Sequence, residues 1–148
     1  MNYWIFKCNP ARYRIADRLM DPEPALTWLV TRYRGEIRPG DVVFIWRTGK
    51  EGGVCAVAQV DSAPEEMRDL PHERQYWVNQ RDDDMNVRIR GRILSRFPCI
   101  SREDLRFVQG LEELSVFHGW QQATNFRVRR EQGQILLKLT GMGHLTTS

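Results

Sequence analysis

The chain has 148 residues, of which 41% are hydrophobic and 28% charged, so it is long enough for one sizeable hydrophobic core and short for two. We therefore expect one domain over residues 1–148. The formal net charge is only +3, but 19 of the 22 basic residues are arginine, which binds phosphate with two donors. A GC-rich genome also enriches arginine, so composition alone leaves the partner open.

Targeting segments and cysteine motifs are missing from the sequence. No stretch approaches the roughly 18 apolar residues of a membrane helix, and the N-terminus lacks the pattern of an export signal. We therefore expect a soluble, cytoplasmic protein. Cys8, Cys55 and Cys99 are odd in number, widely spaced and without a C-x-x-C pair. We predict that they stay reduced, with neither a disulfide nor a zinc site.

The first 60 residues predict three strands and two helices. Residues 2–7 (NYWIFK) are apolar on both faces, as in a strand buried on both sides, and end at the turn Asn9-Pro10. Helices are predicted over 13–20 and from about 25 to 33. Pro39 and Gly40 suit a type II turn before the strand 41–47, and a glycine-containing loop joins that strand to the next, 54–60.

The rest of the chain begins with a polar stretch over 64–84, which we expect to be largely irregular, with one short ordered piece near Tyr76 and Trp77. A strand over 85–94 follows. Ser101 is a natural N-cap for a helix from Arg102. Short helical structure near 111–114, a strand within 119–128 and an amphipathic helix over 130–139 complete the prediction. This α+β order favours a small, strongly curved or barrel-like sheet flanked by helices.

The strand over 85–94 alternates between apolar and polar residues. Period-two geometry predicts that one set faces the core and the other faces outward. The core set is Met85, Val87, Ile89 and Ile93, and the outward set is Asn86, Arg88, Arg90 and Arg92. The arginine stripe is either a solvated sheet face or a phosphate contact, since like charges at alternate positions repel unless an anion meets them.

Common catalytic signatures are absent from the sequence. His72, His118 and His144 are scattered, and none has metal-ligand spacing to another histidine or cysteine. There is no nucleophile elbow, P-loop or dinucleotide-binding glycine motif. Acidic pairs lie in polar loops or first helical turns, where solvation or capping explains them. We expect a protein that needs no metal or cofactor and is not an enzyme.

Aromatic and amide side chains remain as candidate functional groups. The segment GWQQATNFRV, residues 119–128, places amides and a hydroxyl between Trp120 and Phe126. Stacking on aromatic faces holds a nucleic-acid base with about 1–3 kcal/mol, while amides and main-chain groups recognise its edge. Each tryptophan also has a structural explanation, as part of the core or a cover over it.

Four segments together resemble the EVE domain, a member of the PUA-like group that is related in fold to YTH domains. They are YWIFKCNP (3–10), TWLVTRYRGEIRPGDVVFIWRTG (27–49), GGVCAVAQV (52–60) and QQATNFRV (121–128), in family order and over nearly the whole chain. The resemblance implies a small, barrel-like curved sheet with helices around it. It also implies recognition of a modified base in DNA or RNA, held in an aromatic pocket without catalytic groups.

The resemblance also implies which residues form the site. Trp28 would stack on the base, with Trp46 or Phe126 closing an aromatic cage, while Asn9, Thr124 and Asn125 recognise the base edge. Beyond the resemblance, our leading hypothesis adds arginines that meet the phosphates, namely Arg32, Arg47, Arg88, Arg90 and Arg92. Ala123 stands where the family's Gly-Thr-Asn-Phe signature has glycine, so it narrows the pocket or shifts the loop if that glycine has a positive φ.

The leading hypothesis is therefore a non-catalytic module that binds DNA or RNA carrying a modified base, derived from cytosine or adenine. A nuclease or a base-modifying enzyme would be a compatible partner, and a membrane would not. One alternative is a pocket protein or enzyme that acts on a free nucleoside or another small molecule. Another is an interaction subunit whose arginine-rich surface contacts an acidic protein.

Overall fold

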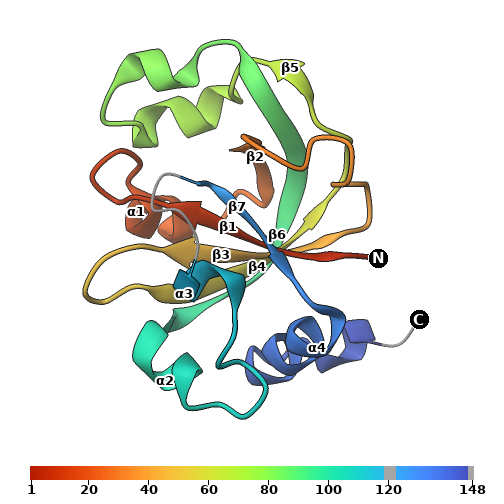
Figure 1. Cartoon of the computed structure of the whole chain (residues 1–148). Coiled ribbons are helices and arrows are strands. Elements are labelled where there is room, and N and C mark those ends of the chain that lie inside the picture. Colours follow the sequence, from red (N-terminus) through yellow and green to blue (C-terminus); the bar gives the residue numbers. More distant parts are fainter. Residues whose placement is uncertain (119–122, 147–148) are drawn as a thin grey trace.

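A computed structural model describes residues 1–118 and 123–146. These residues form a seven-stranded sheet with the strand order β2-β6-β4-β3-β1-β7, in which β5 also pairs with β6 (Figure 1). The strands are β1 (Tyr3–Cys8), β2 (Ala25–Leu29), β3 (Val42–Arg47), β4 (Gly53–Val60), β5 (Glu65–Met67), β6 (Asn86–Ser101) and β7 (Asn125–Val128). The α-helices are α1 (Ile15–Met20), α2 (Arg102–Arg106), α3 (Ser115–His118) and α4 (Arg130–Leu139), and the 3₁₀ helices are η1 (Pro71–Tyr76), η2 (Gln80–Asp83) and η3 (Gly143–Thr146).

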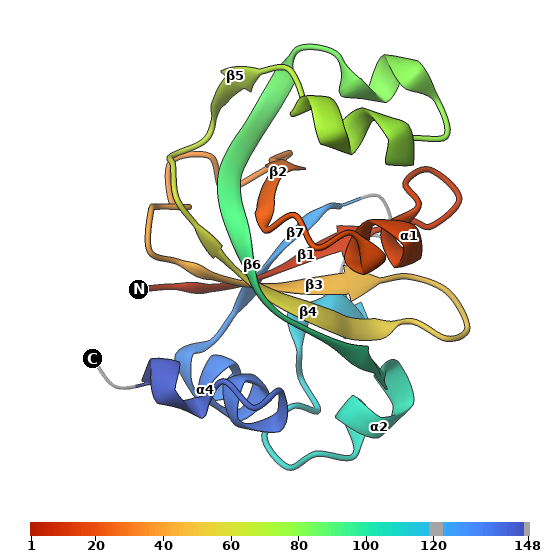
Figure 2. The same cartoon turned by 180° about the vertical axis from the view of Figure 1, so that it is seen from behind.

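Strand β1 separates two hydrophobic cores. It pairs in parallel with β3 and antiparallel with β7, and its side chains alternate between the two sheet faces. Trp4 and Phe6 join the core beneath β2 and α1, whereas Tyr3 and Ile5 join the core covered by the α2–α4 region. Figure 2 shows α2 and α4 on one side of β1, β3 and β4, and β2, at the curved end of the same sheet, on the other. The prediction that the first strand is buried on both sides is confirmed.

The sheet is so strongly curved that its two end strands, β2 and β7, come together. Asn125 on β7 donates from its amide nitrogen to the carbonyl oxygen of Leu29 on β2, at 3.0 Å. Its amide oxygen accepts a hydrogen bond of 2.8 Å from the backbone N–H of Thr31, just beyond β2. A side chain thus joins the two strands. The predicted curved, barrel-like mixed sheet flanked by helices is confirmed.

Residues 25–29 form a strand and not the predicted helix. Strand β2 runs antiparallel to β6, with Thr27 opposite Arg90 and Trp28 opposite Ile89. Aromatic and β-branched residues suit such a pleated, half-buried position better than a helix. The segment 111–114 likewise forms turns, and the short helix α3 begins at Ser115.

The cysteine prediction is wrong for two of the three residues. Cys55 on β4 and Cys99 on β6 form a disulfide, with their Cα atoms 4.2 Å apart. These strands are neighbours in the sheet, and Cys55 lies where their register shifts, between Val54 and Ala56. The separation of 44 residues conceals this proximity in the sequence. Cys8 is a free, buried thiol.

Local signals elsewhere are confirmed. The Ser101 hydroxyl accepts a hydrogen bond of 3.1 Å from the N–H of Asp104, which caps α2, and α4 has the predicted limits. Within the described ranges, no helix is both long and apolar enough to cross a membrane.

Candidate functional site

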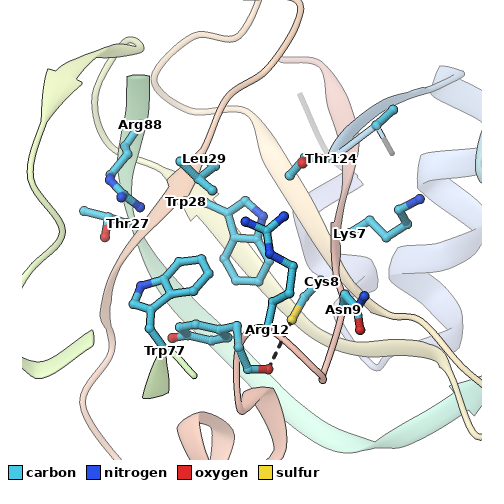
Figure 3. Close-up of a pocket in the computed structure, with 12 residues that line it drawn as sticks. Lys7, Cys8, Asn9, Arg12, Thr27, Trp28, Leu29, Trp77, Arg88 and Thr124 are labelled. Atoms are coloured by element: carbon cyan, nitrogen blue, oxygen red, sulfur yellow. Dashed lines mark hydrogen bonds between the residues drawn. The ribbon is translucent and has the colours of Figure 1, made fainter. Parts of the chain in front are cut away.

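A cavity of about 460 Å³ opens between the end of β1, strand β2 and the excursion that connects β5 to β6 (Figure 3). This volume lies in the range of roughly 300–1,000 Å³ that is typical of ligand sites. The lining residues are Lys7, Cys8, Asn9, Arg12, Tyr13, Thr27, Trp28, Leu29, Trp77, Arg88, Ala123 and Thr124.

The turn after β1 builds one side of the cavity. The side-chain oxygen of Asn9 accepts from the N–H of Ala11 at 2.9 Å, while its carbonyl oxygen accepts from the N–H groups of Arg12 and Tyr13. Such a turn is typical of asparagine before proline. It places Tyr13 inside the wall and leaves Arg12 largely exposed at the mouth, where it contacts Asp82 at 3.2 Å.

Three aromatic rings lie together along the cavity. The ring of Tyr13 meets Trp77 at 4.8 Å and Trp28 at 6.1 Å, in both cases edge to face. Trp28 is 9% exposed, and Trp77 is half-buried. Backbone bridging between Tyr13 and Trp77 fixes this arrangement across the two loops. The ordered piece predicted near Trp77 is therefore a cavity wall, a role that the sequence analysis did not assign to it.

The buried carboxylate of Asp69 holds three lining residues in place. It accepts hydrogen bonds from the hydroxyl of Thr27 and, at 2.6 Å, from the indole N–H of Trp77. Its second oxygen also lies 3.4 Å from a guanidinium nitrogen of Arg88. Asp69 itself is 4% exposed, with one oxygen accepting from the backbone N–H of Leu70. Asp69 thus joins β2, β6 and the excursion behind the cavity.

A second buried acid, Glu73, supports Tyr13 from behind. It accepts hydrogen bonds from the phenol of Tyr13 and the guanidinium of Arg18. Burial raises the pKa of Tyr13, and the charge of Glu73 raises it further. Burial also raises the pKa of Glu73, although the ion pair with Arg18 acts in the opposite direction. The phenol therefore stays protonated and serves as a donor to Glu73.

Two further titratable groups line the cavity at the end of β1. Burial raises the pKa of the Cys8 thiol to about 12, despite the nearby charge of Arg47. The thiol contacts the carbonyl oxygen of Tyr13 at 3.7 Å. Burial lowers the pKa of the Lys7 ammonium group, and the charge of Arg32 lowers it further. Cys8 is thus a protonated wall residue, and Lys7 belongs to a positively charged rim.

Asn9, Trp28 and Thr124 of the predicted base pocket do line the cavity. Trp46 and Phe126 do not, because both belong to the core on the other face of the sheet. Trp46 is 4% exposed and packs against Phe117, with ring centroids 6.1 Å apart. The structure therefore does not bring either ring to a cage around a base.

Asn125 and Arg32 are engaged in joining the sheet ends. The amide nitrogen of Asn125 donates to the Leu29 carbonyl oxygen in β2, and its amide oxygen accepts from the Thr31 N–H just after β2. Arg32 donates to the carbonyl oxygen of Asn125 at 2.6 Å and lies over the ring of Phe126 at 4.7 Å. Neither residue lines the cavity.

Arg88 was predicted to lie on the outward, solvated face of its strand, and the prediction is wrong about its exposure. Its side chain is 1% exposed, since the excursion over residues 69–84 covers that part of β6. Arg90 and Arg92 are exposed as predicted, and Arg92 bonds to Asp61 and Gln59. Arg47 is half-buried at the end of β3, opposite Cys8.

Met85 also departs from the predicted alternation, since it is exposed just before β6 begins. Ala123 is buried and lines the cavity, in the position where the family signature has glycine. Trp120, Gln121 and Gln122 lie outside the described residues. Among the residues that are described, no histidine, cysteine and acidic side chains form a group of three or more that could hold a metal ion.

Comparisons with solved structures show the same fold in several proteins. The alignment with a hypothetical protein from Leishmania major covers 97% of this chain and 97% of that protein's chain, at 18% identity and a TM-score of 0.67. The alignment with protein Atu2648 from Agrobacterium tumefaciens covers 100% of this chain and 97% of that chain, at 20% identity and a TM-score of 0.62. Human THYN1 was solved in complex with DNA containing 5-methylcytosine. The alignment covers 95% of this chain and 98% of the THYN1 chain, at 16% identity and a TM-score of 0.63.

No curated protein matches the sequence of this chain. The sequence model of the EVE domain, in contrast, matches residues 2–139, from the start of β1 to the end of α4. The match spans every strand of the curved sheet and every residue that lines the cavity. The chain therefore belongs to the EVE domain family.

Proposed function

We propose that this protein binds DNA or RNA and recognises a modified base in the cavity beside Trp28, without catalysing a reaction. Membership of the EVE family and the fold shared with human THYN1, solved with DNA containing 5-methylcytosine, support this function. The observation that carries the proposal is the cavity itself. It combines two indole rings and a phenol with polar side chains, which is the chemistry that binds a flat base.

The base enters from the side of Asn9 and Arg12 and stacks against Trp28. Trp77 lies across the cavity from β2 and is fixed by its bond to Asp69 (Figure 3). Asn9 and Thr124 line the same space and carry hydrogen-bonding groups for the base edge. The base must leave its stack to reach this depth, so a base that is already unpaired binds at lower cost.

The phosphates lie along the rim of the cavity. Arg12 is exposed there, Lys7 also lines the cavity, and Arg47 lies at the end of β3 opposite Cys8. Arg90 adds an exposed cation on β6. Guanidinium groups bind phosphate oxygens without regard to sequence, so this rim contributes affinity and leaves selectivity to the cavity.

Titration of the protein with matched oligonucleotides tests this function. The oligonucleotides differ at one cytosine or adenine, which is unmodified or methylated, and are offered as single and double strands of DNA and RNA. We expect tighter binding to a modified oligonucleotide than to its unmodified counterpart. Equal affinity for all modified and unmodified forms would contradict the proposal.

A comparison of ligand length separates base recognition within a strand from binding of a free nucleoside. Rim contacts to phosphate make the oligonucleotide bind much more tightly than the isolated modified nucleoside. Equal affinity for the two would instead support a small-molecule pocket protein.

A further inference from the structure

We infer that Arg32, together with Lys7, forms a site for one phosphate of the bound nucleic acid at the mouth of the cavity, on the side of β7. The inference rests on the proposed function and deepens it, because it assigns one particular phosphate contact in addition to the general rim. It is carried by the way in which Arg32 is held, by its lack of an acidic partner and by its closeness to the cavity lining.

The guanidinium of Arg32 packs on two aromatic rings. Its central carbon lies 4.7 Å from the ring centroid of Phe126 and 5.0 Å from that of Tyr33. Its Nε donates a hydrogen bond of 2.6 Å to the carbonyl oxygen of Asn125. Stacking and this bond together restrict the guanidinium plane. A positive charge is therefore in place before a ligand arrives, which lowers the entropic cost of binding.

Tyr33 presents its ring to Arg32 from an unusual backbone conformation. Among the described residues it is the only one other than glycine with a positive φ, which is 64°. Bulky side chains are rarely found there. Its carbonyl oxygen accepts from the N–H groups of Glu36 and Ile37, at 2.9 and 3.1 Å, and its ring packs against Trp4. Such conformations persist where the surrounding structure holds them, and they are common at ligand sites.

The two terminal nitrogens of Arg32 are not used within the protein. Among the described residues they have no hydrogen-bond partner, and Arg32 has no ion pair. They are not among the buried atoms that lack a partner, so both reach the surface. Arg127 packs on the same Tyr33 ring at 4.9 Å but is paired with Glu36. Arg32 thus presents an unneutralised, planar pair of donors, which is the geometry that binds a phosphate.

Lys7 connects this guanidinium to the cavity. Lys7 lines the cavity, and its ammonium group lies 5.3 Å from the centroid of the Phe126 ring on which Arg32 packs. Burial lowers the pKa of Lys7, and the nearby charge of Arg32 lowers it further. The backbone N–H of Lys7 donates to the carbonyl oxygen of Thr124 at 2.7 Å, and Figure 3 shows both residues on the same side of the cavity. A phosphate beside the two cations relieves their mutual repulsion.

The position of this pair selects a phosphate close to the bound base. Thr124 lines the cavity, and Arg32 is bonded to the residue that follows it, Asn125. In the proposed function the base lies beside Trp28, so its sugar and phosphates remain at the mouth. An anion that contacts both Lys7 and Arg32 therefore belongs to the bound nucleotide or to its direct neighbour.

Arg32 also has a structural role, since its bond to Asn125 helps to join the ends of the sheet. A purely structural Arg32 would lower stability when changed, but it would not distinguish one phosphate from the others. The test therefore compares the charged and neutral forms of single phosphates within one protein. This ratio of affinities does not change when part of the protein is unfolded.

The first experiment uses the unaltered protein and the methylated single strand that binds most tightly in the panel described above. Each phosphate in turn is replaced by a neutral methylphosphonate. Loss of a charge-assisted contact predicts that one substitution, next to the modified base, weakens binding roughly tenfold or more, while the others have smaller and similar effects.

Similar effects at all positions would overturn the inference and leave the proposed function intact, because preference for the modified base is measured separately against the unmodified strand. One dominant phosphate without such a preference would contradict recognition of the modification and keep the phosphate site.

The second experiment repeats this comparison with Arg32→Gln, Arg32→Lys and Arg127→Gln. Arg127 is the matched control, because it packs on the same ring of Tyr33 but is paired with Glu36. Arg32→Gln should reduce the effect of the critical methylphosphonate to about onefold, whereas Arg127→Gln should keep the parent effect. If Arg32→Gln does not fold, Arg32→Lys retains a charge without the planar donors and should still lower the effect. An unchanged effect in a folded Arg32 variant would overturn the inference.

Discussion

The side-chain amide of Asn125 on β7 donates to the carbonyl oxygen of Leu29 on β2, and this bond of 3.0 Å joins the two end strands of the curved sheet. The same amide accepts from the backbone N–H of Thr31. Asn125 is fully buried, so its removal leaves backbone groups without their partner. Leu29, whose carbonyl oxygen accepts this bond, lines the cavity next to Trp28.

Asn125→Ala should therefore lower the free energy of unfolding by about 2–4 kcal/mol, the cost of losing more than one buried hydrogen bond. Urea unfolding followed by circular dichroism measures this change. Thr31→Val is the matched control, because it removes only the hydroxyl contact of 3.3 Å to the same amide and keeps the backbone bond. A loss for Asn125→Ala no larger than that for Thr31→Val would show that the junction adds little stability.

Trp28→Leu should abolish the preference for a modified base, because Leu keeps an apolar side chain in the wall and removes the flat face on which a base stacks. Fluorescence anisotropy with paired modified and unmodified oligonucleotides measures the preference. Trp46→Leu is the control, since Trp46 is similarly buried but lies on the other face of the sheet. Both variants should be less stable, and only Trp28→Leu should change the ratio. The opposite pattern would place the base near Trp46.

Arg12→Ala should weaken all oligonucleotides by a similar factor and reduce the salt dependence of binding. Loss of one phosphate contact lowers the slope of log K against log salt by roughly 0.7–0.9. Affinities measured at several salt concentrations give this slope. Arg92→Ala serves for comparison, because Arg92, like Arg12, is exposed and contacts an aspartate but does not line the cavity. Its slope should stay at the parent value. A base-dependent effect of Arg12→Ala would assign Arg12 to the cavity instead of the rim.

Stability should fall above about pH 9, because the fold raises the pKa of the Cys8 thiol to about 12 and raises that of Tyr13 as well. Both groups are kept protonated by the fold, whereas an unfolded cysteine ionises near pH 8.5 and a tyrosine near pH 10. The stabilisation is thus complete below the unfolded pKa values and is lost as the pH rises toward the folded ones. A single such group contributes a slope of roughly 1.4 kcal/mol per pH unit in this window.

Urea midpoints between pH 7 and pH 11 test this dependence. Cys8→Ala removes one of the two groups, so its stability should fall less steeply between pH 9 and pH 10 than that of the parent protein. Identical slopes for the two proteins would show that the thiol ionises equally easily in both states.

The sequence predicted best the features that depend on neighbouring residues. The Ser101 cap and the limits of α4 need only local hydrogen bonding and helical periodicity, and both are confirmed. The burial of β1 on both sides follows from the apolar side chains on its two faces. The prediction of a helix over the β2 segment was wrong because a short apolar run with mixed periodicity fits a helix or a strand. Pairing with β6, which the local sequence does not show, decides in favour of the strand.

The cavity was only partly predictable, since its walls meet through distant residues. Thr27 and Asp69 are 42 positions apart, and no local sequence pattern predicts their hydrogen bond. The alternation in β6 correctly places Arg88 and Arg90 on one face, but it does not tell that the excursion covers Arg88 and leaves Arg90 exposed. Trp28 was recognisable from the family resemblance, whereas Trp77 had no such signal and lay in a polar stretch.

The excursion over residues 69–84 supplies Trp77 and, through Asp69, Asp82 and Asp84, sets the position of Arg88, while the strands beneath belong to the common frame of the sheet. One wall of the cavity thus comes from a single stretch, which buried ion pairs, Asp69 with Arg88 and Glu73 with Arg18, attach to the scaffold. Exchange of this single stretch between family members is therefore expected to change ligand preference while the strand order of the sheet stays the same, provided that its buried acids keep their partners Arg88 and Arg18.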